Sequence, residues 1–476
     1  MPKTPVALGI VLTLAALGTA GARGEETGVV PGENNGAARL DAASGGGSAA
    51  LPPIASASAP RDRRAAAVEA FVGPFVELAM FDGTILVDAG GEIVYRGSFG
   101  LASYEHRVPH HPGTRFRIAS VSKTLTDAAF AVLLQRGTLT LETPLADYLP
   151  EFPSAGTITV GHLLGHSSGI PHTNDQPWGD GATSFPLDEL VRRLAALPLD
   201  FPPGSDRRYS NGGYAVAAKV LELAGGAPFG EVLRQTVLEP LGMADTGHIE
   251  DARHPIPDMA AGYEPGPEPG RRRLARFYAV ETRAGGGSLY STADDLLRFA
   301  RGVFREGFVA EPLRREVLGA DEEPFLSQGR SPGFVAKLLY RAADDVIVVS
   351  LANSYAVPAD WATVLADLAT GRIAAAPWPS LERAAGAVAP DDPRLGRYRT
   401  SFGSREVGVE RTPAGGLVLR EGASPAVTGL VPLADGAFLL PSYFQRCAQA
   451  SEDRRITCSI LSGNELYTSV WTPLDG

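Results

Sequence analysis

Strand patterns at both ends of one long stretch of the chain, with helical patterns between them, constrain the fold more than any other feature. The Gly90-Gly91 turn separates the first two predicted strands. Because helices fill the chain between the two strand pairs, both ends are expected to join one antiparallel sheet. We predict an α+β fold, with this sheet flanked by helices and a helical region inserted into it. The predicted strands are residues 83–88, 92–97, 334–340 and 345–353, and the predicted helices near them are residues 64–80, 292–303 and 358–370.

The N-terminal residues have the pattern of a secretory signal peptide. Lys3 supplies the charged start, residues 6–17 are apolar, and residues 20–22 are small enough for a cleavage site. The apolar stretch is too short to span a bilayer. We therefore predict a signal peptide over residues 1–22, a mature chain without an integral membrane segment, and a secreted or periplasmic location.

Two stretches of biased composition predict linkers. Residues 23–64 are rich in Gly, Ala, Ser and Pro, and residues 374–393 are rich in Ala and Pro, so neither is expected to bury a core. Short alternating runs after the second linker predict a small all-β domain over residues 394–476. The main domain is then expected between the linkers, over residues 65–373.

The two cysteines of the chain, Cys447 and Cys458, flank a polar turn in the predicted all-β domain. Two strands that fold back there would bring the cysteines opposite each other, close enough to form a bond. An exported protein meets conditions that permit disulfides. We predict a Cys447–Cys458 disulfide, and two buried reduced cysteines are the alternative.

The charge of the chain restricts its partners. The formal net charge is −11, and the longest basic run is Arg271-Arg272-Arg273 in a Pro- and Gly-rich loop. This balance argues against a nucleic-acid partner. We expect the partner to be a small-molecule or peptide substrate.

The segment from Ser120 to Lys123 places a hydroxyl and an amine three positions apart, where the sequence becomes helical. Residues i and i+3 share a helix face, and the N-terminus of a helix favours developing negative charge. Only four of the 43 basic residues are lysines, and an amine, unlike guanidinium, can lose its proton. Ser120 is therefore a candidate nucleophile with Lys123 as its base. An ordinary helix start with a solvated lysine has the same pattern.

Further segments agree with this interpretation, and with them the chain resembles the serine β-lactamase and penicillin-binding protein superfamily. The resemblance is to the class C-like branch, which includes D-alanyl-D-alanine carboxypeptidases and esterases. It extends over residues 68–370 and implies a β-lactamase-like hydrolase domain over residues 65–373. The segments that carry it, besides Ser120–Lys123, are Leu163–Gly169, Pro203-Gly204, Tyr209-Ser210-Asn211, Pro240–Met243 and Gly286–Leu296.

The resemblance implies a role for each matching residue. Ser120 would be acylated, and Lys123 would help to take its proton. Tyr209 would act as base toward Ser120 and as acid toward the leaving group. Asn211 would hydrogen-bond the substrate and position Lys123. The implied activity is that of an exported serine hydrolase acting through an acyl-enzyme on an ester, amide or peptide, without a metal or another cofactor; cell-wall peptides are among the candidate substrates.

The third motif of the family departs from its usual form. The family has Lys or His, any residue, and Gly on an edge strand, whereas the best match here is Ser327-Gln328-Gly329. Serine cannot supply positive charge to a substrate carboxylate, so the resemblance favours esters over penicillins and D-Ala-D-Ala peptides. The backbone N–H groups of Ser120 and Arg330 would form the oxyanion hole. The substrate-binding residues are thus expected to be Asn211, Ser327, Gly329 and Arg330.

Three alternatives remain open. The segment before Ser327, residues 311–326, looks shorter than in the family and lacks its aromatic-Gly strand. A catalytically impaired relative that serves as a binding or regulatory protein would explain both Ser327 and this segment. The segment from Gly165 to Gly169 also fits the nucleophile elbow of an α/β-hydrolase-type lipase or esterase, with Ser167 as nucleophile, but no helix is predicted after it. The third alternative is a metal site at His106, His110 and His111, which are close in sequence. These histidines lack metal-ligand spacing, so we expect solvated loop histidines and no metal site.

Overall fold

The structure is a computed structural model. It describes residues 63–179, 181–266, 271–319, 323–354, 361–375, 381–401, 405–422, 427–440, 445–450, 453–460 and 468–474. All of these belong to one compact unit, residues 55–476. The predicted signal peptide, and the linker over residues 23–64 except its last two residues, lie outside the described residues.

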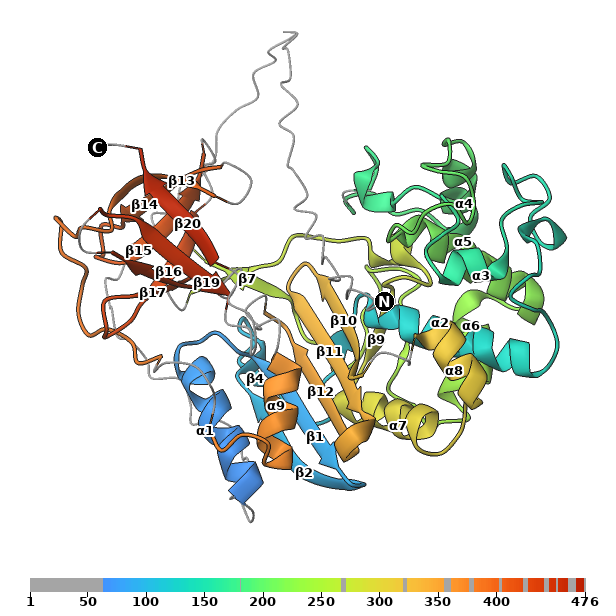
Figure 1. Ribbon diagram of the computed structural model, residues 1–476, viewed down its shortest axis with the longest axis horizontal. Helices are drawn as coiled ribbons and strands as arrows, with labels where there is room; N and C mark the ends of the chain where they lie inside the picture. The colour runs from blue at the N-terminus through green and yellow to red at the C-terminus, as the bar shows by residue number, and fades with distance from the viewer. Residues whose placement is uncertain are drawn as a thin grey trace, which may run out of the picture. The chain divides into compact units, whose positions relative to one another are not determined.

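A five-stranded antiparallel sheet forms the centre of the main domain, in the order β10-β11-β12-β1-β2 (Figure 1). β1 (Gly83–Ala89) pairs with β2 (Glu92–Phe99) on one side and with β12 (Val346–Ala352) on the other. β11 (Phe334–Arg341) connects β12 to the edge strand β10 (Phe325–Ser331). The two ends of the domain therefore meet in one sheet, and the predicted α+β class is confirmed.

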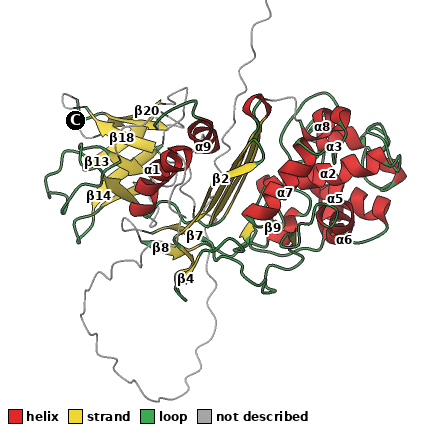
Figure 2. Ribbon diagram, turned by 90° about the horizontal axis from the view of Figure 1, so that it is seen from below, coloured by secondary structure: helices red, strands yellow, loops and turns green. Residues whose placement is uncertain are grey.

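Helices cover both faces of the sheet (Figure 2). α1 (Arg63–Glu77) and α9 (Trp361–Thr370) pack on one face, where Trp361 is fully buried. α2 (Val121–Gln135), α7 (Ala293–Phe304) and α8 (Glu311–Leu318) lie on the other face. Because side chains alternate along a strand, Ile85 and Val87 join the core under α1 and α9 whereas Leu86 joins the core under α2.

The remaining elements of the main domain are short and mostly helical. The small sheet β5-β9-β6 joins the start of α2 to the chain before α7. The other helices are η1 (Leu145–Asp147), α3 (Val160–Leu164), η2 (Thr173–Asp175), α4 (Leu187–Ala195), α5 (Asn211–Gly225), α6 (Phe229–Leu233), η3 (Arg234–Leu238), η4 (Val280–Arg283) and η5 (Ala342–Asp344). The other strands are β3 (Leu101–Ser103), β4 (Val108–Pro109), β5 (Phe116–Arg117), β6 (Gly247–His248), β7 (Tyr263–Pro265), β8 (Arg272–Leu274) and β9 (Leu289–Ser291).

The C-terminal residues form a closed antiparallel barrel in which β13 pairs with β20. Tyr398, Phe438 and Trp471 fill its core together with a disulfide between Cys447 and Cys458. The predicted all-β domain and its disulfide are thus present. The strands are β13 (Gly396–Thr400), β14 (Glu406–Arg411), β15 (Leu417–Glu421), β16 (Val427–Pro432), β17 (Phe438–Leu440), β18 (Gln445–Gln449), β19 (Ile456–Ile460) and β20 (Thr468–Pro473).

None of the helices in the described ranges combines the length and the apolar character that crossing a membrane requires. In the described residues, the last helix of the main domain ends at Thr370 and the first barrel strand starts at Gly396. The domain boundaries at residues 373 and 394 remain predictions.

Candidate active site

Ser120 lies directly before the first turn of α2, as the sequence pattern predicts. Ala119 before it has a left-handed backbone (φ 45°), and Ile118 donates its N–H to Leu289 O on β9 at 3.0 Å. Ser122 Oγ also accepts the N–H of Leu289 at 3.1 Å, so both sides of Ser120 are tied to this strand. A serine before a helix commonly caps it, but the Ser120 hydroxyl makes no cap bond. It is therefore available for another partner.

The partner of that hydroxyl is Tyr209. Ser120 Oγ and Tyr209 Oη are 2.7 Å apart, although the residues are far apart in the sequence. Tyr209 directly precedes the N-cap residue of α5, Ser210, whose Oγ accepts the N–H of Gly213 at 3.0 Å. The Tyr209 side chain is 47% exposed, so the Ser120–Tyr209 pair is open to solvent. A nucleophile and a base in contact at an accessible position have the geometry of nucleophilic catalysis.

Lys123 lies beneath this pair and is only 7% exposed. Its Nζ donates to Asn211 Oδ1 at 2.7 Å and to Gly286 O at 2.6 Å, and lies 4.7 Å from the centre of the Tyr209 ring. An ammonium has three N–H donors, so one remains for the hydroxyls of the site. The structure thus brings Ser120, Lys123, Tyr209 and Asn211 together.

Two buried polar residues behind Lys123 were not recognised in the sequence. Tyr214 Oη donates to Asp127 Oδ1 at 2.8 Å, and Lys123 Nζ lies 5.1 Å from the centre of the Tyr214 ring. Burial raises the pKa of Asp127 well above its usual range, even though Tyr214 and Lys123 act in the opposite direction. The charged form of Asp127 is therefore disfavoured. An acidic residue one turn after Lys123, inside an apolar helix, is a signal that could have revealed this pair.

Strand β10 borders the site at Gly329. A Cβ at this position would lie 2.2 Å from Ile118 O and 2.8 Å from Ser120 N, so only glycine allows the strand to approach so closely. The side chain of Ser327 is on the same face as Gly329, and its Oγ is 2.7 Å from Thr124 Oγ1 on α2. Ser327 therefore faces the nucleophile helix, at the position predicted for the missing Lys or His. Thr124 was not recognised in the sequence.

The backbone around Ser120 suits an oxyanion hole. Within the part of the chain that the structure describes, the Ser120 N–H takes part in no backbone hydrogen bond. Arg330, which follows Gly329, pairs with Val335 on β11 and has an exposed side chain. Backbone N–H groups at positions such as those of Ser120 and Arg330 stabilise negative charge on the carbonyl oxygen of an acyl-transfer intermediate.

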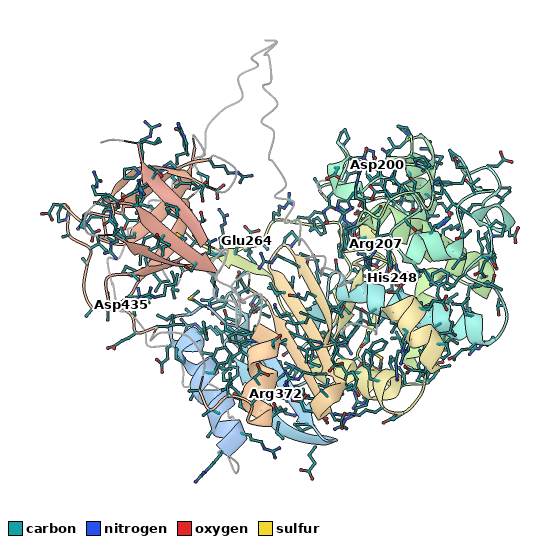
Figure 3. All side chains as sticks on the ribbon, in the orientation of Figure 1. Asp200, Arg207, His248, Glu264, Arg372 and Asp435 are labelled. Carbon is teal, nitrogen blue, oxygen red and sulfur yellow. A yellow bond between two sulfur atoms is a disulfide. The ribbon has the colours of Figure 1, made fainter. Side chains whose placement is uncertain are left out.

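Arg207, which is labelled in Figure 3, supplies a positive charge near Tyr209. Its exposed side chain donates from Nε to Gly165 O at 3.2 Å, and its charge helps to lower the pKa of His166, whose ring contacts Tyr209. No carboxylate among the described residues lies within 4.0 Å of the Arg207 guanidinium. The neighbouring Arg208, in contrast, pairs with Asp200 at 3.2 Å and with Asp206 at 3.9 Å.

One alternative and one expectation from the sequence do not agree with the structure. An elbow at Ser167 needs a strand before it and a helix after it, whereas α3 precedes Ser167 and a loop follows. His110 is not solvated as expected, because it is 2% exposed, stacks on Phe116 and is 3.1 Å from Asn353 Oδ1. The described residues contain no group of three or more His, Cys, Asp or Glu placed to hold a metal ion.

Comparison with known proteins agrees with this geometry. The "Beta-lactamase" family model matches residues 68–355. Esterase EstB of Burkholderia gladioli is 34% identical over 304 residues, which cover 55% of this chain and 75% of EstB. The D-alanyl-D-alanine-carboxypeptidase/endopeptidase AmpH of Escherichia coli K12 is 29% identical over 238 residues, which cover 47% of this chain and 57% of AmpH.

Solved structures show the same fold. The penicillin binding protein from Bacillus halodurans superposes with a TM-score of 0.53 at 25% identity, covering 60% of this chain and 95% of that protein. SurE superposes with a TM-score of 0.56 at 22% identity, covering 87% of this chain and 99% of SurE. The fold, the family match and the relatives define a serine hydrolase that acts through an acyl-enzyme, and the chain belongs to the beta-lactamase family.

Proposed function

We propose that this chain hydrolyses carboxylic esters, with Ser120 as the acylated nucleophile. The observation that supports this most is the 2.7 Å contact between Ser120 Oγ and Tyr209 Oη above the buried Lys123. The roles that an acyl-transfer site needs are then all filled: a nucleophile, a base, an amine that shares a proton with the base, and backbone donors for the oxyanion. This completeness argues against the catalytically impaired relative.

The proposed reaction has two halves. Tyr209 first gives its hydroxyl proton to the Lys123 amine. As Ser120 Oγ attacks the carbonyl carbon, its proton passes to Tyr209 Oη, which then delivers it to the departing oxygen or nitrogen. A water molecule next attacks the acyl-enzyme, the same pair takes its proton, and Ser120 regains a proton as the acid product leaves. Asn211 orients Lys123 throughout, because its Oδ1 accepts from Nζ.

Two observations favour esters. Ser327 is uncharged and is already hydrogen-bonded to Thr124, so it offers no cation to a substrate carboxylate. EstB, of which the alignment with this chain covers 75%, is named an esterase. The ester carbonyl would lie between the Ser120 and Arg330 N–H groups, beside Gly329.

The second candidate function is hydrolysis of a peptide, including one derived from the cell wall, whose leaving residue ends in a carboxylate. Arg207 favours it, because this guanidinium has no carboxylate partner among the described residues and acts on the histidine beside Tyr209. Tyr209 is the proposed proton donor to the leaving group, so an anion on that group would be on the Arg207 side. AmpH is named a D-alanyl-D-alanine carboxypeptidase, which agrees with this candidate.

We also propose that the chain is exported, to the periplasm or the medium. The signal-like residues 1–22 and the Cys447–Cys458 disulfide support export, since disulfides persist in oxidising compartments. N-terminal sequencing of the secreted protein would test the predicted cleavage after residue 22.

Fluorophosphonate labelling followed by peptide mapping tests the proposed nucleophile. We expect the adduct on Ser120. An adduct on Ser167 would revive the elbow, and a folded protein without any adduct would favour the impaired relative. Initial rates on 4-nitrophenyl butyrate, and on a D-alanyl-D-alanine peptide with a free or an amidated C-terminus, then separate the two candidate functions. Preference for the free over the amidated peptide would support the peptidase.

Replacing Ser327 by histidine is expected to change substrate preference. The ring would place a cationic donor on the Ser120 side of β10, and a hydrogen bond to a charged group contributes about 1.5–3 kcal/mol. We expect kcat/KM for the free-carboxylate peptide to rise about tenfold relative to the butyrate ester. Gln328→His is the matched control, because Gln328 is on the other face of the strand and accepts from Lys337 Nζ. Equal effects of both substitutions would show that the third motif is wrongly aligned.

A further inference from the structure

Two histidine rings flank the proposed base Tyr209. The centre of the His166 ring is 4.7 Å from the centre of the Tyr209 ring, and that of His172 is 5.6 Å away. His166 belongs to the family-like segment Leu163–Gly169, whereas His172 lies after it, directly before η2. No family-like segment of the sequence includes His172, and its position beside Tyr209 could not be expected from the sequence.

Both rings accept hydrogen bonds from the start of α5. His166 Nδ1 accepts the N–H of Ser210 at 3.2 Å, and His172 Nδ1 accepts the N–H of Asn211 at 3.0 Å. The first backbone N–H groups of a helix have no partner within the helix, so these two ring nitrogens and Ser210 Oγ complete the helix end. The Tyr209–Asn211 segment is thereby held from outside α5.

The bond to Asn211 leads directly to the catalytic lysine. Asn211 Oδ1 accepts from Lys123 Nζ at 2.7 Å, so His172 holds the backbone of the residue whose side chain orients Lys123. Its ring contacts Tyr209 as well. A shift of the His172 ring would therefore move both members of the proton-transfer pair. His166 is less informative, because its left-handed backbone (φ 58°) ties it to the local fold.

We propose that His172 is a positioning residue of this active site, whose unprotonated Nδ1 fixes Asn211, and through it Lys123, relative to Tyr209. The inference rests on the proposed function in one respect, namely that Lys123 and Tyr209 carry the proton of Ser120. His172 itself touches neither the substrate nor the reacting atoms in this account.

A ring nitrogen accepts a hydrogen bond only when it carries no proton, so the hydrogen bond from the Asn211 N–H to His172 Nδ1 depends on pH. Burial, together with the charges of Lys123 on α2 and Arg283 on η4, lowers the pKa of His172 to about 4, although Asp175 on η2 acts in the opposite direction. Burial with Lys123, Arg207 and His172 lowers the pKa of His166 to about 3. Because both values are depressed, the acceptor is present near neutral pH and is lost as the pH falls through about 4 for His172.

The test compares two substitutions at His172 with a surface control. His172→Asn keeps an acceptor, since Asn Oδ1 can occupy the place of Nδ1, whereas His172→Leu removes it. His106→Leu is the control, because His106 is exposed in the turn between β3 and β4 and donates its backbone N–H to Ser103 Oγ, a bond that the substitution keeps. The measurements are the rate of fluorophosphonate labelling of Ser120, kcat and KM on 4-nitrophenyl butyrate, and amide hydrogen exchange of the peptide spanning residues 209–213.

We expect His172→Leu to lower kcat and the labelling rate about 10- to 100-fold, because a misplacement of about 1 Å is sufficient for such losses. KM should change less than threefold, and exchange in residues 209–213 should accelerate. His172→Asn should stay within about threefold of the parent near neutral pH. Its acid limb of kcat should lie at lower pH than that of the parent, because Asn Oδ1 takes up no proton where His172, with a pKa of about 4, does. Circular dichroism at each pH ensures that only folded protein is compared.

Three results would overturn the proposal: unchanged labelling in His172→Leu, equal losses in His172→Leu and His172→Asn, or an acid limb that does not move in His172→Asn. Failure of the proposed function is distinguishable, because the parent protein itself would then not be labelled. In that case hydrogen exchange still tests whether His172 holds the start of α5. Unaltered protection of residues 209–213 in His172→Leu would contradict the positioning role without any reference to activity.

Discussion

Replacing Ser120 by alanine is expected to abolish ester hydrolysis, with a loss in kcat of at least about 10³-fold. The Ser120 hydroxyl is the group in contact with Tyr209 Oη, and its removal leaves the base without a nucleophile. Stability should change little, because the hydroxyl does not cap α2. Initial rates on 4-nitrophenyl butyrate and the midpoint of thermal unfolding measure the two effects.

Ser167→Ala is the control for this prediction. Ser167 lies in the loop after α3, and its N–H donates to His162 O at 2.9 Å, a bond that the substitution keeps. Activity of Ser167→Ala should stay close to that of the parent. If Ser120→Ala retained most of its turnover while Ser167→Ala lost it, the proposed nucleophile would be wrong.

Replacing Lys123 by arginine is expected to remove nearly all activity, about 10²- to 10³-fold, although the charge is kept. A guanidinium does not lose its proton in proteins, so it cannot relay the proton of Ser120. It is also a planar fork, whereas Nζ fits between Asn211 Oδ1 and Gly286 O at 2.7 and 2.6 Å. The measurement is kcat, with fluorophosphonate labelling as a second readout of the nucleophile.

Lys219→Arg provides the matched control, since Lys219 on α5 pairs with Asp188 and Glu222 away from the site. It should preserve turnover, because its lysine serves only ion pairs. A Lys123→Arg enzyme with nearly normal turnover would exclude proton transfer by Lys123. In that event the lysine would act only through its charge.

The central sheet could be predicted because its signals are local. β1 and β2 are separated by the Gly90-Gly91 turn, and β11 and β12 are mostly apolar strands, so their predicted ranges were within a few residues of the observed ones. The closure of the barrel was not predicted, since the pairing of β13 with β20 joins residues at the two ends of the domain. A run of alternating strands reveals β structure but not which strand pairs with which.

The active site likewise has residues that could be recognised from the sequence and contacts that could not. Ser120 and Lys123 were recognisable from a single helical turn, and Tyr209 and Asn211 from the resemblance. The contact of Ser327 with Thr124 and that of His172 with Asn211 join distant segments, so no sequence pattern indicated them. His110 was expected in solvent because it lies in a loop, but the Asn353 side chain and the Phe116 ring enclose it.

The close approach of Gly329 to the nucleophile determines how relatives with this site can diverge. Any side chain at position 329 would collide with Ile118 O, which is backbone and cannot rotate away. The Ser327 side chain, on the same face, is hydrogen-bonded to the Thr124 hydroxyl, so a substitution there changes a side-chain contact and not the spacing of the backbone. We therefore expect position 329 to remain glycine for steric reasons, whereas position 327 and the loops around Tyr209 can change with the substrate.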